Sequence, residues 1–172
     1  MRRAGVVTGA ALVLAVGFCG TGAWTYAQAR GDDSLAYGRE RDRALADGRA
    51  ALTVLTTLDA SSRQRAQAGI RSWAASSTGP LRDELARTAP KQGASARGTV
   101  TEAAVTALDT HSGTAKLIAS VTVDVTPAGT KTPTTDRKRL EAVLERTDGG
   151  RWKVRALDAV PLGQAAQKGD GR

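Results

Sequence analysis

The chain has few of the residues that most often carry chemistry. Among its 172 residues, cysteine and histidine occur once each, as Cys19 and His111. A single cysteine cannot form a disulfide within the chain. One histidine argues against a Ser–His–Asp triad, and with one neighbouring carboxylate it cannot fill a zinc site. The sequence also has no phosphate-binding loop, glycine-rich nucleotide fingerprint or paired-cysteine motif. It therefore predicts no catalytic residue, no cofactor and no metal.

Aromatic residues make up only 3% of the chain, and half of them precede residue 30. We therefore expect a small core of alanine, valine and leucine. The formal net charge is +8, but the basic residues come without stacking aromatics, which argues against nucleic acid as a partner. Charges of both signs alternate over residues 39–43 (RERDR), which is typical of a solvated helix face rather than a binding patch.

Acidic residues are absent before Asp32, and two arginines precede an uncharged run over residues 4–27. A helix over that run would be about 36 Å long, enough to cross a hydrocarbon core about 30 Å thick. The basic start places the N-terminus in the cytoplasm and the rest of the chain outside. We predict a single-pass plasma-membrane protein whose anchor has an apolar stretch and an outer aromatic pair, represented by Ala4, Val13, Phe18, Trp24 and Tyr26.

This segment has a second interpretation, a signal peptide that is cleaved after Ala29. Residues 27–29 (AQA) form an A-x-A site after a basic start, as in a secretory signal. The apolar run is longer than a usual signal core, and the aromatic pair suits a membrane interface, so we favour the uncleaved anchor. No lipid-attachment site is expected, because Phe18, just before Cys19, is not small.

Helical periodicity dominates the next part of the chain. Residues 33–58 carry leucines and small residues at spacings of three, four and seven, which predicts one long membrane-proximal helix. A second helix is expected over 62–76, with Asp59 as its N-cap. A short third helix over 80–88 follows the break at Gly79 and Pro80.

The period then changes to two. Strands are predicted over residues 99–108, 115–126, 137–147 and 151–160, the first with a bulge near 103–104. The second strand has the clearest pattern, because every other residue from 117 to 125 is apolar and those between are mostly polar. Asp148 and Gly149 are expected to supply positive φ in the hairpin before the last strand.

These elements define four parts of the chain. They are a cytoplasmic stub and anchor (1–29), the long helix (30–58), the helices and sheet of an extracytoplasmic domain (59–162) and a flexible tail (163–172). Three helices followed by a four-stranded antiparallel meander predict an α+β domain, with one face of a curved sheet packed on the helices. Such a curved sheet can leave a cone-shaped cavity at its open end. Close packing of four apolar sheet residues against the helices would argue against this cavity: Leu117, Val121, Trp152 and Val154.

Three segments in this order resemble one known family. They are residues 55–59 (LTTLD), 78–84 (TGPLRDE) and the hairpin 144–154 (LERTDGGRWKV). With the N-terminal anchor they are similar to the actinobacterial Mce-associated membrane proteins, whose outer domain resembles the cystatin-like or nuclear-transport-factor-2-like fold. The resemblance covers nearly the whole chain. The loop at 91–97 is shorter and aromatic residues are scarcer than in typical members.

The resemblance implies a non-catalytic accessory role beside Mce-type lipid or steroid import systems of the cell envelope. Its expected contacts are the cell membrane and Mce-type or permease subunits. The family has no assigned catalytic residues, so the shared segments have structural roles. Gly79 and Pro80 turn one helix into the next, Asp148 and Gly149 form the hairpin, and Trp152 fills the core. The alternatives are a carrier of an apolar ligand in the cone and an isomerase- or dehydratase-like enzyme.

Few polar residues are candidates for such an enzyme. Asp109 and His111 lie in a predicted turn, where a solvated turn is the simpler interpretation. Glu102 and Asp124 fall on strands whose outward face is expected to be polar. The serines of the helical region have no histidine near them in the sequence: Ser61, Ser62, Ser76 and Ser77.

Overall fold

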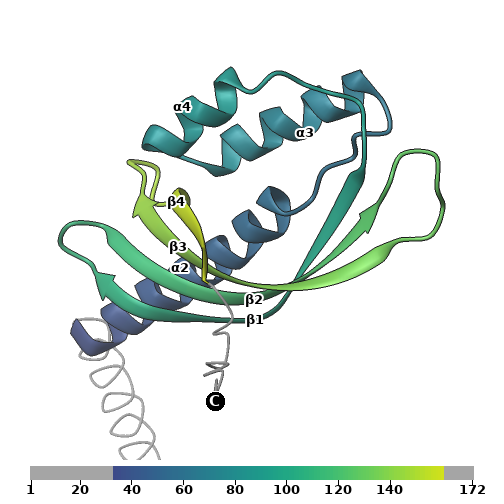
Figure 1. Cartoon of the computed structure of the whole chain (residues 1–172). Helices are drawn as coiled ribbons and strands as arrows, with labels where there is room; N and C mark the ends of the chain where they lie inside the picture. Colours follow the sequence, from purple (N-terminus) through teal and green to yellow (C-terminus); the bar gives the residue numbers. More distant parts are fainter. Residues whose placement is uncertain (1–32, 161–172) are drawn as a thin grey trace, which may run out of the picture. The chain divides into compact units, whose positions relative to one another are not determined.

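A computed structural model describes residues 33–160 of the chain. Three helices are followed by four strands (Figure 1): α2 (Asp33–Leu55), α3 (Arg63–Ser76), α4 (Gly79–Arg87), β1 (Ser95–Asp109), β2 (Thr114–Thr126), β3 (Thr134–Arg146) and β4 (Trp152–Val160). The predicted anchor and tail lie outside the described residues. Within those residues, no helix is both long and apolar enough to cross a bilayer. The chain divides into two compact units, Met1–Glu40 and Arg41–Arg172, and the packing below is that of the second.

The four strands form one antiparallel sheet in the order β1-β2-β3-β4. This meander confirms the predicted α+β class, with helices first and an antiparallel sheet after them. Each strand pairs with the next along the chain through a short connection, and the β1–β2 turn contains Gly113 at φ +66°. The register of β1 shifts twice, between Val100 and Glu102 and between Val105 and Ala107. The predicted single bulge near residues 103–104 is therefore replaced by two bulges that flank it.

The alternation of β2 separates a buried face from an open one. Leu117, Ala119, Val121 and Val123 are at most 8% exposed and lie in one core with Leu140, Ala142 and Leu144 of β3. Residues between them on β2 are half-buried or exposed. A two-residue period places every second side chain on the same face of a sheet, so this pattern alone decides which face meets the helices.

Small residues let α2 pack closely on this buried face. A Cβ at Gly48 would lie 2.9 Å from Leu144 Cδ1 and 3.1 Å from Leu117 Cδ1. The helix backbone therefore comes nearer to the sheet than a larger residue would allow. Leu52 of α2 is completely buried in the same core, and burial of a leucine side chain contributes about 1.5–3 kcal/mol.

The end of α2 differs from the prediction. The helix ends at Leu55 and not at Leu58, because Leu58 and Ala96 exchange two backbone hydrogen bonds of 2.8 Å. Leu58 is thus part of the edge of the sheet beside β1. The Trp73 indole N–H donates to the carbonyl oxygens of Val54 at 2.8 Å and Thr57 at 2.9 Å. The Val54 carbonyl also accepts from the Thr57 backbone N–H at 3.1 Å, so the indole adds a second donor there and supplies the donor for the Thr57 carbonyl just beyond the helix.

The start of α3 also differs from the prediction. The N-cap is Ser62, whose hydroxyl accepts from the backbone N–H of Arg65, and not Asp59. The Asp59 carboxylate instead accepts from the hydroxyl and the backbone N–H of Ser61 and pairs with the Arg65 guanidinium at 3.0 Å. Asp59 therefore organises the loop that precedes the cap.

Two strands begin earlier than predicted. β1 starts at Ser95 rather than residue 99, where Ser95 pairs with Thr126. β3 starts at Thr134 rather than residue 137, where Thr134 pairs with Val125. Ladder hydrogen bonds join backbone groups, so polar ends of a strand can pair without an apolar pattern.

The last hairpin has its positive φ at Gly150 (+74°), and the prediction for Asp148 and Gly149 is wrong. The Gly150 N–H donates to the Thr147 carbonyl, and the Thr147 N–H donates to the Arg151 carbonyl, both at 2.8 Å. In a hairpin built around a type I turn, the left-handed residue is the last one, where glycine is favoured.

Trp152 lies at the start of β4 and is 2% exposed within the core. Its backbone N–H donates to Asp47 Oδ2 of α2 at 2.9 Å, and the same oxygen accepts from Arg151 Nε at 3.2 Å. The Trp152 indole N–H is buried and has no acceptor among residues 33–160. The ring is therefore held by packing and by the bond of its backbone to α2.

Gly79 and Pro80 begin α4, and Gly79 has φ +55°. Just before them, the Thr78 N–H donates to the Val154 carbonyl at 2.8 Å. Ser77 is fully buried, and its hydroxyl donates to the Trp73 carbonyl at 2.9 Å. The segment between α3 and α4 is thereby attached to β4.

Candidate functional site

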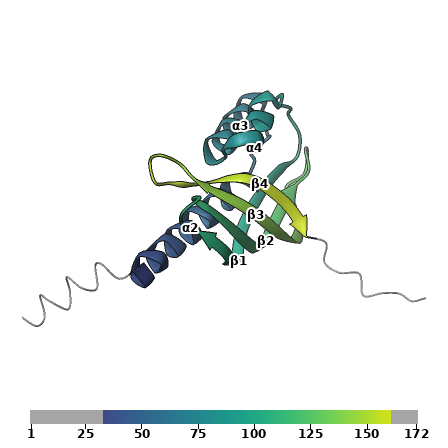
Figure 2. The same ribbon diagram turned by 90° about the vertical axis from the view of Figure 1, so that its left-hand side faces the viewer.

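The candidate site is the face of the sheet opposite α2. Figure 2 shows α2 along one side of the strands, and the side chains of the other parity project from the opposite side. On this open face Glu102 of β1, Ser120 of β2 and Arg139 of β3 occupy one cross-strand row. Thr122 and Arg137 form the neighbouring row. The antiparallel register thus brings together residues that are far apart in the sequence.

Two adjoining hollows lie along these rows, with volumes of about 400 Å³ and about 360 Å³. They share Glu102, Ser120 and Arg139 and together form the open-face groove. The remaining residues of the larger hollow are Thr101, Val121, Thr122, Arg137 and Lys138, and those of the smaller are Ala103, Ala104, Ile118 and Ala119.

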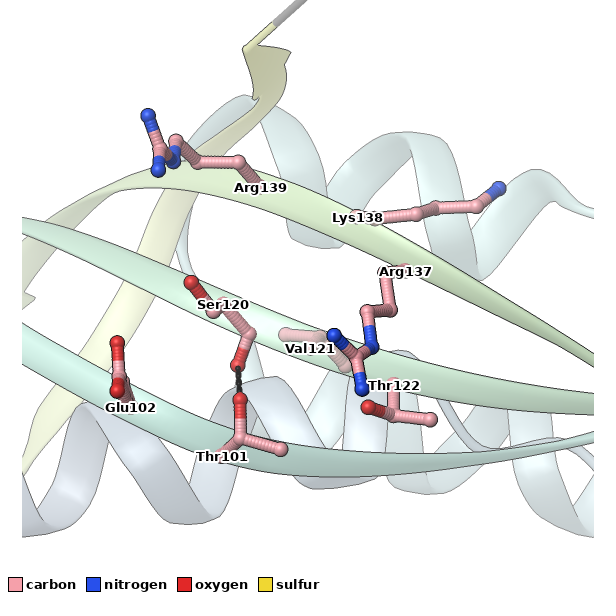
Figure 3. A pocket seen from close by; sticks show the side chains of 8 residues that line it. All are labelled: Thr101, Glu102, Ser120, Val121, Thr122, Arg137, Lys138 and Arg139. Carbon is pink, nitrogen blue, oxygen red and sulfur yellow. Dashed lines mark hydrogen bonds between the residues drawn. The ribbon is translucent and has the colours of Figure 1, made fainter. Parts of the chain in front are cut away.

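The first bulge of β1 shapes this groove. Thr101 is the extra residue between Val100 and Glu102, and its hydroxyl donates to the Ser120 carbonyl at 3.0 Å (Figure 3). A bulge bends its strand and increases the local twist. Thr101 therefore fastens the bent part of β1 to β2 through a side chain.

The groove has more positive than negative charge. Arg137 and Arg139 of β3 are exposed, and Figure 3 shows the Arg137 guanidinium extending toward Thr122 and the Arg139 guanidinium extending from the other side of the strand. Lys138 pairs with Asp136 at 3.7 Å, and Glu102 is the one acidic residue of the lining. Because Lys138 and Asp136 are both exposed, their ion pair contributes only about 0–1 kcal/mol to stability.

The polar groups of the groove are mainly hydrogen-bond donors. Its polar groups are hydroxyls, two guanidinium groups, one ammonium and one carboxylate, and the residues that line it include no histidine or cysteine. Guanidinium groups donate in a fork that fits carboxylates. Such a surface can bind an extended segment that carries hydrogen-bond acceptors and acidic side chains.

The Asp109–His111 pair lies in the β1–β2 turn, away from this groove. Asp109 accepts from the Ser112 hydroxyl at 2.7 Å and from the backbone N–H groups of His111 and Ser112. These bonds, led by the one from the Ser112 hydroxyl, lower the pKa of Asp109 below its ordinary value. The carboxylate therefore organises the turn through the backbone of His111 and not through its imidazole.

The other polar candidates are dispersed. Asp124 accepts from the Thr135 hydroxyl at 2.6 Å, and only Glu102 lines the open-face groove. The hydroxyl of Ser61 bonds to Asp59 and that of Ser62 caps α3. Among the described residues, no group of three or more His, Cys, Asp or Glu is arranged to hold a metal ion.

The four apolar sheet residues that test for a cone-shaped cavity are closely packed. Leu117, Val121, Trp152 and Val154 are each at most 2% exposed and belong to one core. Val121 reaches the wall of the open-face groove. Trp152 borders a separate hollow of about 500 Å³ between α2, α3 and the start of β4.

No protein-family model and no curated protein matches this chain. Among solved structures it is similar to an Ntf2-like protein involved in plasmid conjugation, at 13% identity and a TM-score of 0.49. That alignment covers 74% of this chain and 51% of the other, so this chain spans about half of its length.

Two further structures give lower TM-scores. The intermembrane-space region of the chloroplast protein ARC6 is 14% identical with a TM-score of 0.39, covering 53% of this chain and 77% of that one. A protein from Catenulispora acidiphila is 16% identical with a TM-score of 0.39, covering 80% and 94%. Likenesses at this level carry no argument about family or function.

The sequence patterns single out neither Arg137 nor Arg139, although both line the groove. The available signal is the alternation along β3, because Leu140, Ala142 and Leu144 of this strand face the core. Odd-numbered residues of β3 therefore lie on the opposite face from this apolar set.

Proposed function

We propose that this chain is a non-catalytic accessory protein of the cell envelope that binds another protein through the open-face groove. In this proposal residues 4–27 anchor it in the plasma membrane, and the domain that follows lies outside. The partner is an Mce-type or permease subunit of a lipid or steroid import complex. The family and the partner come from the resemblance of segments 55–59, 78–84 and 144–154.

One observation supports a binding role more than any other. The two faces of the same strands differ: one is filled by the core with α2, while the other has two adjoining hollows lined by exposed arginines and hydroxyls. A solvent-exposed face of a sheet needs polar residues, but it does not need hollows. Hydrogen-bond donors along a groove suit a partner segment that supplies carbonyl and carboxylate acceptors.

The test is recovery of partners from membranes with matched variants. Full-length tagged protein is purified in mild detergent, and companion proteins are identified by mass spectrometry. The groove variant is Arg137→Glu with Arg139→Glu. The control is Arg63→Glu with Arg87→Glu, which changes the same number of exposed arginines on α3 and α4.

We expect the wild type and the control to recover Mce-type or permease subunits and the groove variant to lose at least nine-tenths of them. If the groove variant recovered as much of these subunits as the wild type, the groove would not be the binding surface. Recovery of the protein without envelope subunits would overturn the accessory role.

A further inference from the structure

A second hollow lies on the helical side of the domain, apart from the open-face groove. It has a volume of about 620 Å³ and lies between α3, α4 and the start of β4. Figure 1 and Figure 2 both show α3 and α4 side by side above β4. Small-molecule sites commonly occupy about 300–1,000 Å³, so the size suits a compact ligand.

One face of α3 forms the floor of this helical hollow. Gln67, Ile70, Arg71, Ala74 and Ala75 of α3 line it, and their spacing of three and four residues puts them on one side of a helix. Ala66 and Trp73 lie on the adjoining side of α3, where Ala66 is buried and the Trp73 indole bonds to the Val54 carbonyl of α2. The floor therefore continues, through Ile70 and Ala74, the apolar side of α3 that carries Ala66 and Trp73.

Small side chains keep the hollow open. Ala74 and Ala75 of α3, Ala86 of α4 and Pro90 all line it. Ile70 is 9% exposed, which gives the floor a branched apolar side chain. Alanines between two packed helices leave room that leucines would fill, and the resulting surface suits a hydrocarbon chain.

The polar part of the hollow is cationic. Arg71 of α3, Arg82 of α4 and Lys153 of β4 line it, and none of its ten lining residues is acidic. Within residues 33–160, none of these three cations is in an ion pair; the arginines that pair with acids lie elsewhere, for example Arg65 and Arg151. Three cations from three elements beside an apolar floor are complementary to an anion that carries a hydrocarbon chain.

We propose that the helical hollow binds a single-chain anionic amphiphile, with its carboxylate or phosphate on Arg71, Arg82 and Lys153 and its acyl chain on the alanine floor. This inference is independent of the partner proposed for the open-face groove. Arginine forks bind the head group in two-point contacts, and the lysine supplies a third positive charge. An uncharged analogue of such a ligand, the alcohol of the same chain length, lacks the group that the cations recognise.

The experiment uses the full chain in nanodiscs of phosphatidylcholine and a fatty acid that carries a diazirine on its chain. After photolysis, labelled peptides are mapped by mass spectrometry. We expect labels on α3 and α4 at the hollow, and competition by dodecyl phosphate below its micellar concentration. Dodecanol at the same concentration should not compete.

Matched variants distinguish binding in the hollow from a general effect of positive charge on labelling. Arg71→Gln with Arg82→Gln should reduce labelling at least tenfold, and high salt should weaken it further. Arg63→Gln with Arg87→Gln removes the same charge from the same two helices outside the hollow and should label as the wild type does. Ala74→Leu, which fills the floor and keeps all three cations, should also reduce labelling.

Three results would overturn the inference. The first is equal labelling of the two double variants. The second is competition by dodecanol as strong as that by dodecyl phosphate, which would mean that the cations are not used. The third is labelling that appears only in nanodiscs with phosphatidylglycerol and resists dodecyl phosphate, which would indicate docking on an anionic bilayer.

Discussion

The two tryptophans of the described domain are held in opposite ways. Trp73, between α2 and α3, is half-buried, and its indole N–H donates to two carbonyl oxygens at the end of α2. Trp152, at the start of β4, is 2% exposed, and its indole N–H has no acceptor among residues 33–160. One ring acts through its polar atom and the other through its volume.

This difference teaches how a chain with few aromatics uses each of them. The core is made of alanine, valine and leucine, so Trp152 supplies a large share of its apolar volume at the place where β4 meets α2. At the α2–α3 junction the need is different, because the Thr57 carbonyl just beyond α2 requires a donor and the Trp73 indole supplies it. The same residue type thus solves a packing problem at one place and a hydrogen-bonding problem at the other.

The largest effect is expected from Trp152→Ala. Removal of a buried aromatic ring leaves a cavity and costs about 3–5 kcal/mol of unfolding free energy, which is a large fraction of the roughly 5–15 kcal/mol typical of a domain. Urea unfolding followed by circular dichroism measures the loss. Thr122→Ala on the open face is the control and should change the stability by less than about 0.5 kcal/mol. A loss for Trp152→Ala as small as for the control would contradict the packing role.

Trp73→Phe should give the next effect. The phenyl ring keeps most of the apolar area, but the carbonyls of Val54 and Thr57 lose their shared donor. The Val54 carbonyl keeps the Thr57 backbone N–H at 3.1 Å, so the Thr57 carbonyl is the acceptor that loses its donor. An acceptor left unsatisfied in a partly buried place costs about 1–3 kcal/mol. The same unfolding experiment applies, and faster exchange of the amide protons in the last turn of α2 should accompany the loss. A neutral result would mean that water replaces the indole without cost.

Trp152→Phe should have a smaller effect than Trp73→Phe. This substitution removes the buried indole N–H, which has no acceptor among residues 33–160, so no hydrogen bond is lost. Removal of an unsatisfied buried donor is favourable and offsets part of the packing energy that the smaller ring loses. We expect a loss of about 1 kcal/mol or less, as for conservative apolar exchanges in a core. The two phenylalanine variants together test the comparison directly, because the reverse order of their losses would refute it.

The smallest effect is expected from Asp59→Asn and depends on pH. The Ser61 hydroxyl, then the Ser61 backbone N–H and the Arg65 guanidinium, lower the pKa of Asp59 below its ordinary value of 3.8. A carboxyl group whose pKa is lower in the folded state stabilises that state above pH 3.8, and this contribution is lost as the pH falls through the lowered pKa. Asp59→Asn should therefore be less stable than the wild type at pH 6 and approach it at pH 2. A stability difference that stays constant over this range would show that the charge of Asp59 is not involved.

Much of the fold could be predicted from local patterns. The alternation of residues 117–125 defines the inward face of β2, and the helical spacing of the leucines after residue 44 defines the face of α2 that meets it. The break before Pro80 and the turn at Gly113 also follow from residue type. These features depend on neighbours within one or two turns, so they can be recognised before the chain is folded.

The candidate site could be predicted only in part. Arg137 and Arg139 are on the open face by parity, but their place beside Glu102 depends on the β1 bulge and on the register of three strands. The helical hollow depends on how α4 lies against α3 and β4. Neither the register of the strands nor the packing of α4 can be read from a short stretch of sequence, because both depend on contacts between distant segments.

The sequence by itself determined the order of helices and strands, the antiparallel meander and the apolar faces, because a period of 3.6 or two is a property of consecutive residues. The tertiary structure alone decided that Leu58 leaves the helix to pair with Ala96 and that Ser62 rather than Asp59 caps α3. It also decided which carbonyls Trp73 meets and that the cations of α3, α4 and β4 converge. Each of these depends on a partner far away in the chain, and a residue with two acceptable local conformations takes the one that its distant partner stabilises.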